Sequence, residues 1–130
     1  MTRMKDQQGQ TLAEFALTLP LLLLLLFAIF QFGFLFYSYI SIQQAAREGA
    51  RIAAVGADDT KITTRIQNAS AVDPAKLTIA ITPATRTSGD EVTVTVSIPA
   101  AELLAMPFVA SYLPAKIEAK AAMRMERDFP

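Results

Sequence analysis

Residues Leu19–Ile40 read LPLLLLLLFAIFQFGFLFYSYI, and this stretch decides the class of the protein. It lies inside a longer segment, Phe15–Ala46, that contains no charged residue. A bilayer core about 30 Å thick needs about 20 apolar residues in a helix. Fourteen Leu, Ile and Phe residues lie between Leu19 and Phe36. At about 0.3–0.6 kcal/mol each, they favour insertion by about 4–8 kcal/mol, more than the ~3 kcal/mol that one carboxylate costs there. We therefore predict a transmembrane span of about residues 15–42.

A cleaved secretory signal peptide is the main alternative for this segment. Its apolar region would be about 7–15 residues long and would end in a small-x-small cleavage site. The run found here is longer, and Gly, Phe, Tyr and Gln residues follow its leucines. A buried helix of a soluble protein is also disfavoured, because the remaining chain is too short to surround it. Pro20 does not argue against a span, since membrane helices tolerate proline.

The charges that flank the span do not fix its orientation. Arg3 and Lys5 precede it, and Arg47 and Arg51 follow it, which is close to a tie under the positive-inside rule. The N-terminal tail is short, whereas the C-terminal part is long and polar. This asymmetry favours an N-terminus in the cytoplasm and a C-terminal domain in the periplasm.

Composition narrows the possible functions. The chain has 130 residues, enough for one small domain, and its formal net charge is zero, which gives no indication of nucleic-acid binding. It contains no Cys and no His, so disulfides, thiolate chemistry and the commonest general base are absent. No P-loop or serine-nucleophile motif is present. We predict no enzyme activity, no metal or other cofactor, and no small-molecule substrate.

The short sequence before the span carries a possible processing site. Residues 1–9 read MTRMKDQQG, and Glu14 and Phe15 follow Gly9 at the start of the apolar run. If the chain were cut between Gly9 and Gln10, a new amine would form. On a neighbouring helix shifted along its axis, that amine would pair with Glu14 and fix the alignment of the two helices. The alternative is an ordinary carboxylate at the membrane surface.

A second pattern follows the span, where Ala45–Arg51 reads AAREGAR. Small residues at helical spacing allow close approach of another backbone. Glu48 stands three residues before Arg51, at ion-pair spacing. The small stripe could pack on the chain's own sheet or against another subunit, and both interpretations remain open.

Three later runs alternate between apolar and polar residues, as strands with one buried face do. The apolar positions are Leu77, Ile79 and Ile81; Val92, Val94, Val96 and Ile98; and Ile117, Ala119, Ala121, Met123 and Met125. Asp58 or Asp59 is predicted to cap a short helix that carries Ile62, Ile66 and Ala69 on one face and is closed by Pro74. Residues 85–90 are predicted to form a hairpin turn, and Pro99–Pro114 a short helix or loop. Because a bare three-stranded sheet is unstable, the long helix or the short one must cover it. The fold class is therefore α+β: a long N-terminal transmembrane helix followed by a small antiparallel three-stranded sheet domain.

The leader and the AAREGAR segment together resemble the TadE-like family, which comprises minor pilin-like (pseudopilin) subunits of Tad/Flp tight-adherence type IV pilus systems. The positions that match the family pattern are Gly9, Glu14, Phe15, Ala16, Pro20, Ala45, Ala46, Arg47, Glu48, Gly49, Ala50 and Arg51. Small Flp-type pilins usually carry tyrosine where Phe15 stands here. The resemblance implies cleavage between Gly9 and Gln10 by a prepilin peptidase in the inner membrane, and assembly through Glu14 and Phe15 with other pilin-like subunits and the Tad machinery.

Two functions follow from these observations. The first is a membrane-anchored pseudopilin with a leader at 1–9, an N-terminal helix at 10–56 and an exported domain at 57–130. The second is a single-pass membrane-anchored binding or scaffold module in the periplasm that takes no part in a pilus.

Overall fold

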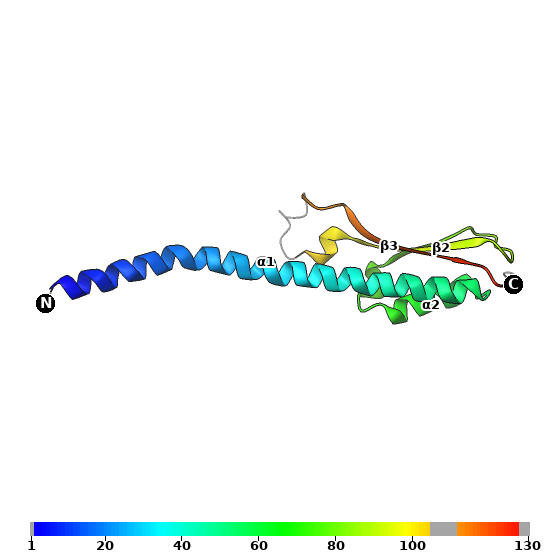
Figure 1. The fold of residues 1–130 in the computed structure, drawn as a ribbon, viewed down its shortest axis with the longest axis horizontal. Coiled ribbons are helices and arrows are strands. Elements are labelled where there is room, and N and C mark those ends of the chain that lie inside the picture. The colour runs from blue at the N-terminus through cyan, green and yellow to red at the C-terminus, as the bar shows by residue number, and fades with distance from the viewer. Residues whose placement is uncertain (1, 105–111, 128–130) are drawn as a thin grey trace. The chain divides into compact units, whose positions relative to one another are not determined.

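A computed structural model describes the backbone of residues 2–104 and 112–127, and the side chains in these ranges from Gly9 onward. Contacts within the chain define two compact units, Met1–Gly33 and Phe34–Pro130. One helix, α1 (Thr2–Ala54), contributes residues to both units (Figure 1).

The N-terminal unit consists of the first part of α1, and its apolar side chains are uncovered on every side. The six consecutive residues Leu21–Leu26 are each between 43% and 68% exposed. Six residues exceed one full turn of an α-helix, so no side of this stretch is covered. The helix continues through Pro20. Among the described residues, α1 is the one helix that is long and apolar enough to cross a membrane.

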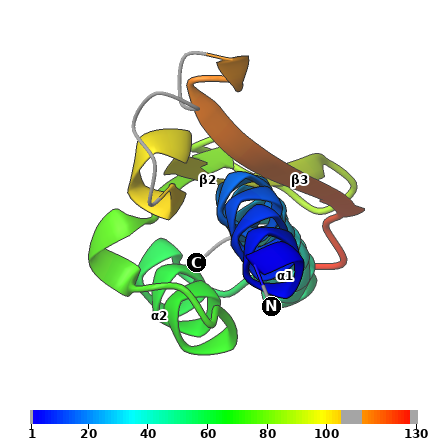
Figure 2. The same cartoon turned by 90° about the vertical axis from the view of Figure 1, so that its left-hand side faces the viewer.

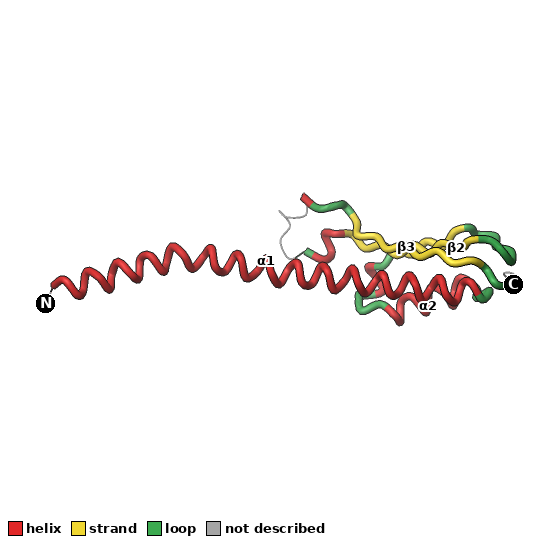
Figure 3. The backbone as a smooth tube through the Cα atoms, viewed as in Figure 1, coloured by secondary structure: helices red, strands yellow, loops and turns green. Residues whose placement is uncertain are grey.

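The C-terminal unit is built on a three-stranded antiparallel sheet with the strand order β1-β2-β3. Figure 3 shows β2 and β3, which pair antiparallel, running alongside each other. Its strands are β1 (Thr78–Thr82), β2 (Glu91–Pro99) and β3 (Lys116–Arg124). The register places Val96 opposite both Ile79 and Ala119, so alternate residues of all three strands share one apolar face. The predicted α+β fold, with a long N-terminal helix and a small antiparallel sheet, is confirmed.

The apolar face of the sheet is covered both by the part of α1 that belongs to this unit and by α2 (Asp59–Ala69) (Figures 1 and 2). The fully buried core residues are Ile42, Ala45, Ala46, Ala50 and Ala53 of α1, Ile62 and Ile66 of α2, and Val92, Val94, Val96 and Ile98 of β2. The large side chains come from α2 and β2, whereas α1 contributes mostly alanines. Small side chains on α1 let its backbone approach the other two elements closely.

α2 begins where the sequence predicts. Asp58 is its N-cap, and its Oδ1 accepts a hydrogen bond from the Lys61 backbone N–H at 3.0 Å. Ile62 and Ile66 are buried, as expected from their spacing. Ala69, which was predicted on the same face, is exposed because it is the last residue of the helix and lies beyond the core.

One connection differs from the prediction, and a second agrees with it where it is described. Pro74 does not end α2, which stops at Ala69; it opens a short 3-10 helix, Pro74–Lys76. The segment that starts at Pro99 begins with another 3-10 helix, Ala100–Leu103, and Leu103 is buried. Residues 105–111 of that predicted helix or loop lie outside the described residues.

The β1–β2 connection contains the predicted turn. Gly89 has φ +98°, a left-handed conformation that glycine adopts without strain. The Asp90 carboxylate accepts hydrogen bonds from the backbone N–H and the hydroxyl of Thr87, at 2.9 and 2.7 Å. The bond from the hydroxyl, and then the one from the backbone, lower the pKa of Asp90, and both bonds close the turn that leads into β2.

Candidate functional site

The predicted processing site lies on an exposed part of α1. Gly9 and Gln10 are exposed, and a Cβ atom placed on Gly9 meets no atom within 4 Å. The Gln10 side-chain amide donates a hydrogen bond to Glu14 Oε1 at 3.0 Å. Sequence reasoning had not assigned this role to the Gln10 side chain, although the spacing of four residues would have indicated it.

The predicted assembly residues share this exposure. Glu14 is exposed, and Phe15 is 59% exposed. The Glu14 backbone carbonyl accepts a hydrogen bond from the Thr18 hydroxyl at 2.9 Å. No part of the described N-terminal unit covers these two side chains, so both are available to a neighbouring helix or to lipid.

The AAREGAR segment has a different environment, because its small residues are inside the C-terminal unit. Ala45, Ala46 and Ala50 are fully buried. The structure therefore brings the small stripe against the chain's own α2 and sheet, which is one of the two arrangements that the sequence left open.

Gly49 marks the closest approach within this core. A Cβ atom on Gly49 would lie 2.6 Å from both Cγ1 and Cδ1 of Ile66 on α2, and 3.3 Å from Cγ1 of Val94 on β2. Contacts below 3.0 Å are not sustained by real Cβ atoms. Glycine is thus required here by the space available between α1, α2 and β2, and its helical backbone is ordinary.

The charged residues of AAREGAR form an ion-pair cluster on the surface of the unit. Glu48 Oε1 lies 2.8 Å from a guanidinium nitrogen of Arg51 and 2.8 Å from one of Arg65 on α2. Hydrogen bonds from Arg51, and then from Arg65, lower the pKa of Glu48 to about 2. The same contact raises the pKa of Arg51. Arg47, by contrast, is exposed.

Glu48 therefore ties α1 to α2, a partnership that the sequence alone did not reveal. The spacing within AAREGAR predicts the pair between Glu48 and Arg51, and that pair is present. Arg65 is 17 residues from Glu48 in the chain, so only the folding of α2 back along α1 brings these side chains together.

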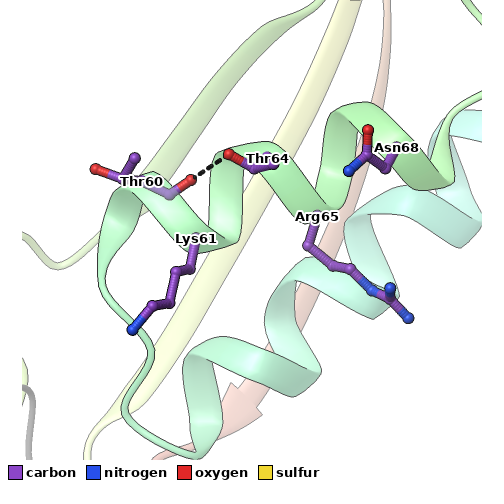
Figure 4. Close-up of a pocket in the computed structure, with 5 residues that line it drawn as sticks. All are labelled: Thr60, Lys61, Thr64, Arg65 and Asn68. Atoms are coloured by element: carbon purple, nitrogen blue, oxygen red, sulfur yellow. Dashed lines mark hydrogen bonds between the residues drawn. The ribbon is translucent and has the colours of Figure 1, made fainter.

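A shallow hollow of about 240 Å³ lies on the outer side of α2 (Figure 4). It is lined by Thr60, Lys61, Thr64, Arg65 and Asn68. All five residues are exposed and come from one helix. The Arg65 guanidinium is engaged with Glu48, and the Thr64 hydroxyl donates to the Thr60 carbonyl at 2.8 Å. We interpret the hollow as a solvated helix face.

Two further charge clusters lie in this unit. The side chain of Arg86, from the β1–β2 connection, is fully buried and pairs with Asp59 at the start of α2. On β3, Glu118 lies between Lys116 and Lys120, at 2.7 and 2.8 Å. Hydrogen bonds from these lysines lower the pKa of Glu118 to about 2. Within the part of the chain that the structure describes, no group of three or more acidic side chains could hold a metal ion.

Comparison with known proteins finds a family that part of the chain resembles. Residues 9–51 match the family model for TadE-like protein. The resemblance that the sequence indicated is thereby confirmed. No curated protein matches the chain, and neither does any solved structure.

The TadE-like segment begins at Gly9 and ends at Arg51, the two ends of the pattern described above. It includes the exposed apolar part of α1 and the buried AAREGAR turns, but not α2 or the sheet. The long apolar helix in this segment is consistent with single-pass membrane anchoring.

Proposed function

We propose that this protein is a membrane-anchored pseudopilin that is required for assembly of a Tad/Flp-type adhesive pilus and is processed by prepilin peptidase after Gly9. The observation that carries this proposal is the TadE-like match, which starts at Gly9 and runs through the whole apolar segment to Arg51. The helix would lie in the inner membrane with its N-terminus in the cytoplasm. The C-terminal unit would fold in the periplasm.

The change in side-chain exposure along α1 supports this proposal. From Leu12 to Ile40 most large apolar side chains are more than a third exposed, whereas from Ile42 to Ala54 the small residues are buried in the unit's own core. A helix with this pattern can bind lipid or other helices along its N-terminal part. Its C-terminal part meanwhile carries a folded domain.

Processing is tested by mass spectrometry of protein extracted from membranes. The mature chain should begin at Gln10. Gly9→Val should abolish this product, whereas Gly33→Val should not, and a Cβ at either glycine meets no atom within 4 Å. A chain that starts at Met1 or Thr2 in cells with active peptidase would contradict the proposal.

Assembly is tested at Glu14. Glu14→Leu should leave membrane insertion intact, because it makes the start of the span more apolar, yet it should reduce piliation. Glu14→Gln serves as the matched variant, since it keeps a hydrogen-bond acceptor for Gln10 but removes the charge. Equal loss in both variants is expected if Glu14 pairs with the new amine of a neighbour. Normal piliation in both would remove the role of the charge in alignment.

Crosslinking distinguishes a pseudopilin from an anchored binding module. The chain has no Cys, so single cysteines can be introduced without a background. A cysteine at the exposed Phe30 should trap other pilin-like subunits, whereas one at the exposed Ala122 should not. Capture of a soluble partner through Ala122 alone would favour the binding module.

A further inference from the structure

An apolar groove of about 210 Å³ lies at the end of the C-terminal unit where this unit begins on α1. It is lined by Leu35, Phe36 and Tyr39 of α1 and by Leu113, Pro114 and Ile117 before and within β3. None of these described lining residues is charged. An apolar cavity of about 150 Å³ is large enough to hold benzene, so this groove can take a short hydrocarbon segment.

The residues beside the groove are those that favour the boundary between lipid and water. Tyr112, which directly precedes Leu113, is 89% exposed. Tyr37 and Tyr39 of α1 are 58% and 39% exposed. These are the only tyrosines of the chain. Tyrosine is enriched at membrane interfaces, because its ring enters lipid while its hydroxyl stays hydrated.

The helical wall of the groove also belongs to the segment that can cross the membrane. Twenty residues of the charge-free run, Phe15–Phe34, precede Leu35. About 20 residues suffice to cross the hydrocarbon core. Leu35, Phe36 and Tyr39 therefore lie in the last part of the predicted span of about residues 15–42, and the medium next to them at this depth is the outer part of the lipid leaflet.

We propose that the groove holds part of a phospholipid acyl chain of the extracytoplasmic leaflet, with Tyr112 inserted beside it at the membrane surface. The inference rests on the membrane insertion and orientation of the proposed function, but not on pilus assembly. The C-terminal unit then has a second contact with the bilayer besides the transmembrane helix. Extraction of the subunit has to break this contact as well.

The experiment uses the absence of Trp from the chain. Full-length variants with one tryptophan each are reconstituted in phosphatidylcholine vesicles whose acyl chains are brominated near the headgroup, and quenching of fluorescence is measured. Tyr112→Trp should be quenched about as strongly as Tyr37→Trp. Val55→Trp is the control, because Val55 is exposed and lies about 24 Å beyond Tyr39 along the helix. It should lose little fluorescence.

A charge tests the groove itself. Leu113→Asp should reduce quenching of Tyr112→Trp and leave that of Tyr37→Trp unchanged, whereas Ala122→Asp, at an exposed position on β3, should change neither. Circular dichroism establishes that both variants remain folded.

The outcomes distinguish membrane insertion of the helix from the lipid contact of the groove. If Tyr37→Trp is not quenched, membrane insertion fails and the proposed function fails with it. If Tyr37→Trp is quenched but Tyr112→Trp is not, the lipid contact is wrong while the anchor stands. A third outcome is that the fluorescence of Tyr112→Trp changes with the protein-to-lipid ratio and stays the same when the acyl chains are brominated. That result would assign the groove to a second copy of the chain, which also overturns the inference.

Discussion

Replacing Gly49 by Ala is expected to destabilise the C-terminal unit, although the same change stabilises an ordinary helix. The added Cβ would lie 2.6 Å from two atoms of Ile66 and 3.3 Å from Val94. Ordinary van der Waals contact begins near 3.4 Å, so Ile66 would have to move by several tenths of an ångström. Because Ile66 is fully buried among α1, α2 and β2, this movement would press it against other core side chains.

The magnitude follows from two opposing effects. An extra methyl group in a well-packed core costs about 1–3 kcal/mol. The higher helix propensity of Ala over Gly returns about 1 kcal/mol. Overlap with two atoms favours the upper part of the first range, so we expect a net loss of about 1–2 kcal/mol in the free energy of unfolding. For a domain of this size the melting temperature falls by about 4–8 °C for each kcal/mol.

The assay is thermal and urea unfolding of the full-length protein in detergent micelles, with the sheet followed by circular dichroism. Gly33→Ala is the matched control on the same helix, since its Cβ meets no atom within 4 Å. It should leave unfolding of the C-terminal unit unchanged. Ile66→Ala alone should cost about 2–5 kcal/mol. In that background, adding Gly49→Ala should be neutral or stabilising, because the new methyl group enters the vacated space.

Increased stability of the Gly49→Ala single variant would refute this reasoning, because it would show that the helices can separate without cost. The reasoning would fail equally if the losses from Gly49→Ala and Ile66→Ala simply added. In that case the two side chains do not compete for the same space.

Three further predictions concern charges and caps in the same unit, each measured by urea unfolding. Glu48→Gln should lower stability at neutral pH. The folded-state pKa of Glu48 is about 2, below its usual 4.5. The difference in the free energy of unfolding between the variant and the wild type should therefore shrink as pH falls from about 4.5 to about 2. A difference that grows as the pH falls would contradict the ion pair. Asp58→Ala should cost about 0.5–2 kcal/mol through loss of the N-cap, and Asp58→Ser should retain most of the stability; equal losses would exclude capping. Asp59→Ala should lower the free energy of unfolding more than Arg86→Met does, because only Asp59→Ala leaves the buried guanidinium without this carboxylate. A larger loss in Arg86→Met would refute that explanation.

The long helix and the strands could be predicted because their signals are local. An uncharged apolar run from Phe15 to Ala46 has few alternatives to a membrane helix. Alternation along Val92–Ile98 selects an extended strand with one buried face, and that face is buried in the structure. Asp58 was recognisable as a cap because Ser, Thr, Asp and Asn recur at helix starts.

The parts that escaped prediction depend on residues far apart in the chain. The pairing of Glu48 with Arg65 and the burial of Arg86 against Asp59 arise only after α2 has folded against α1 and the hairpin. Pro74 and Ala69 were misplaced because local spacing does not show where the core ends. The groove beside Tyr112 likewise combines α1 with residues more than seventy positions later in the chain.

The sequence by itself determined that this protein has a helix long and apolar enough to span a membrane, followed by a small α+β domain. Hydrophobicity and the spacing of apolar residues are properties of short stretches of sequence, and they favour a helix or a strand before any tertiary contact forms. Only the tertiary structure decided that the AAREGAR alanines and Gly49 are buried within the chain's own core. That choice depends on the space left between α1, α2 and β2, which no local pattern encodes.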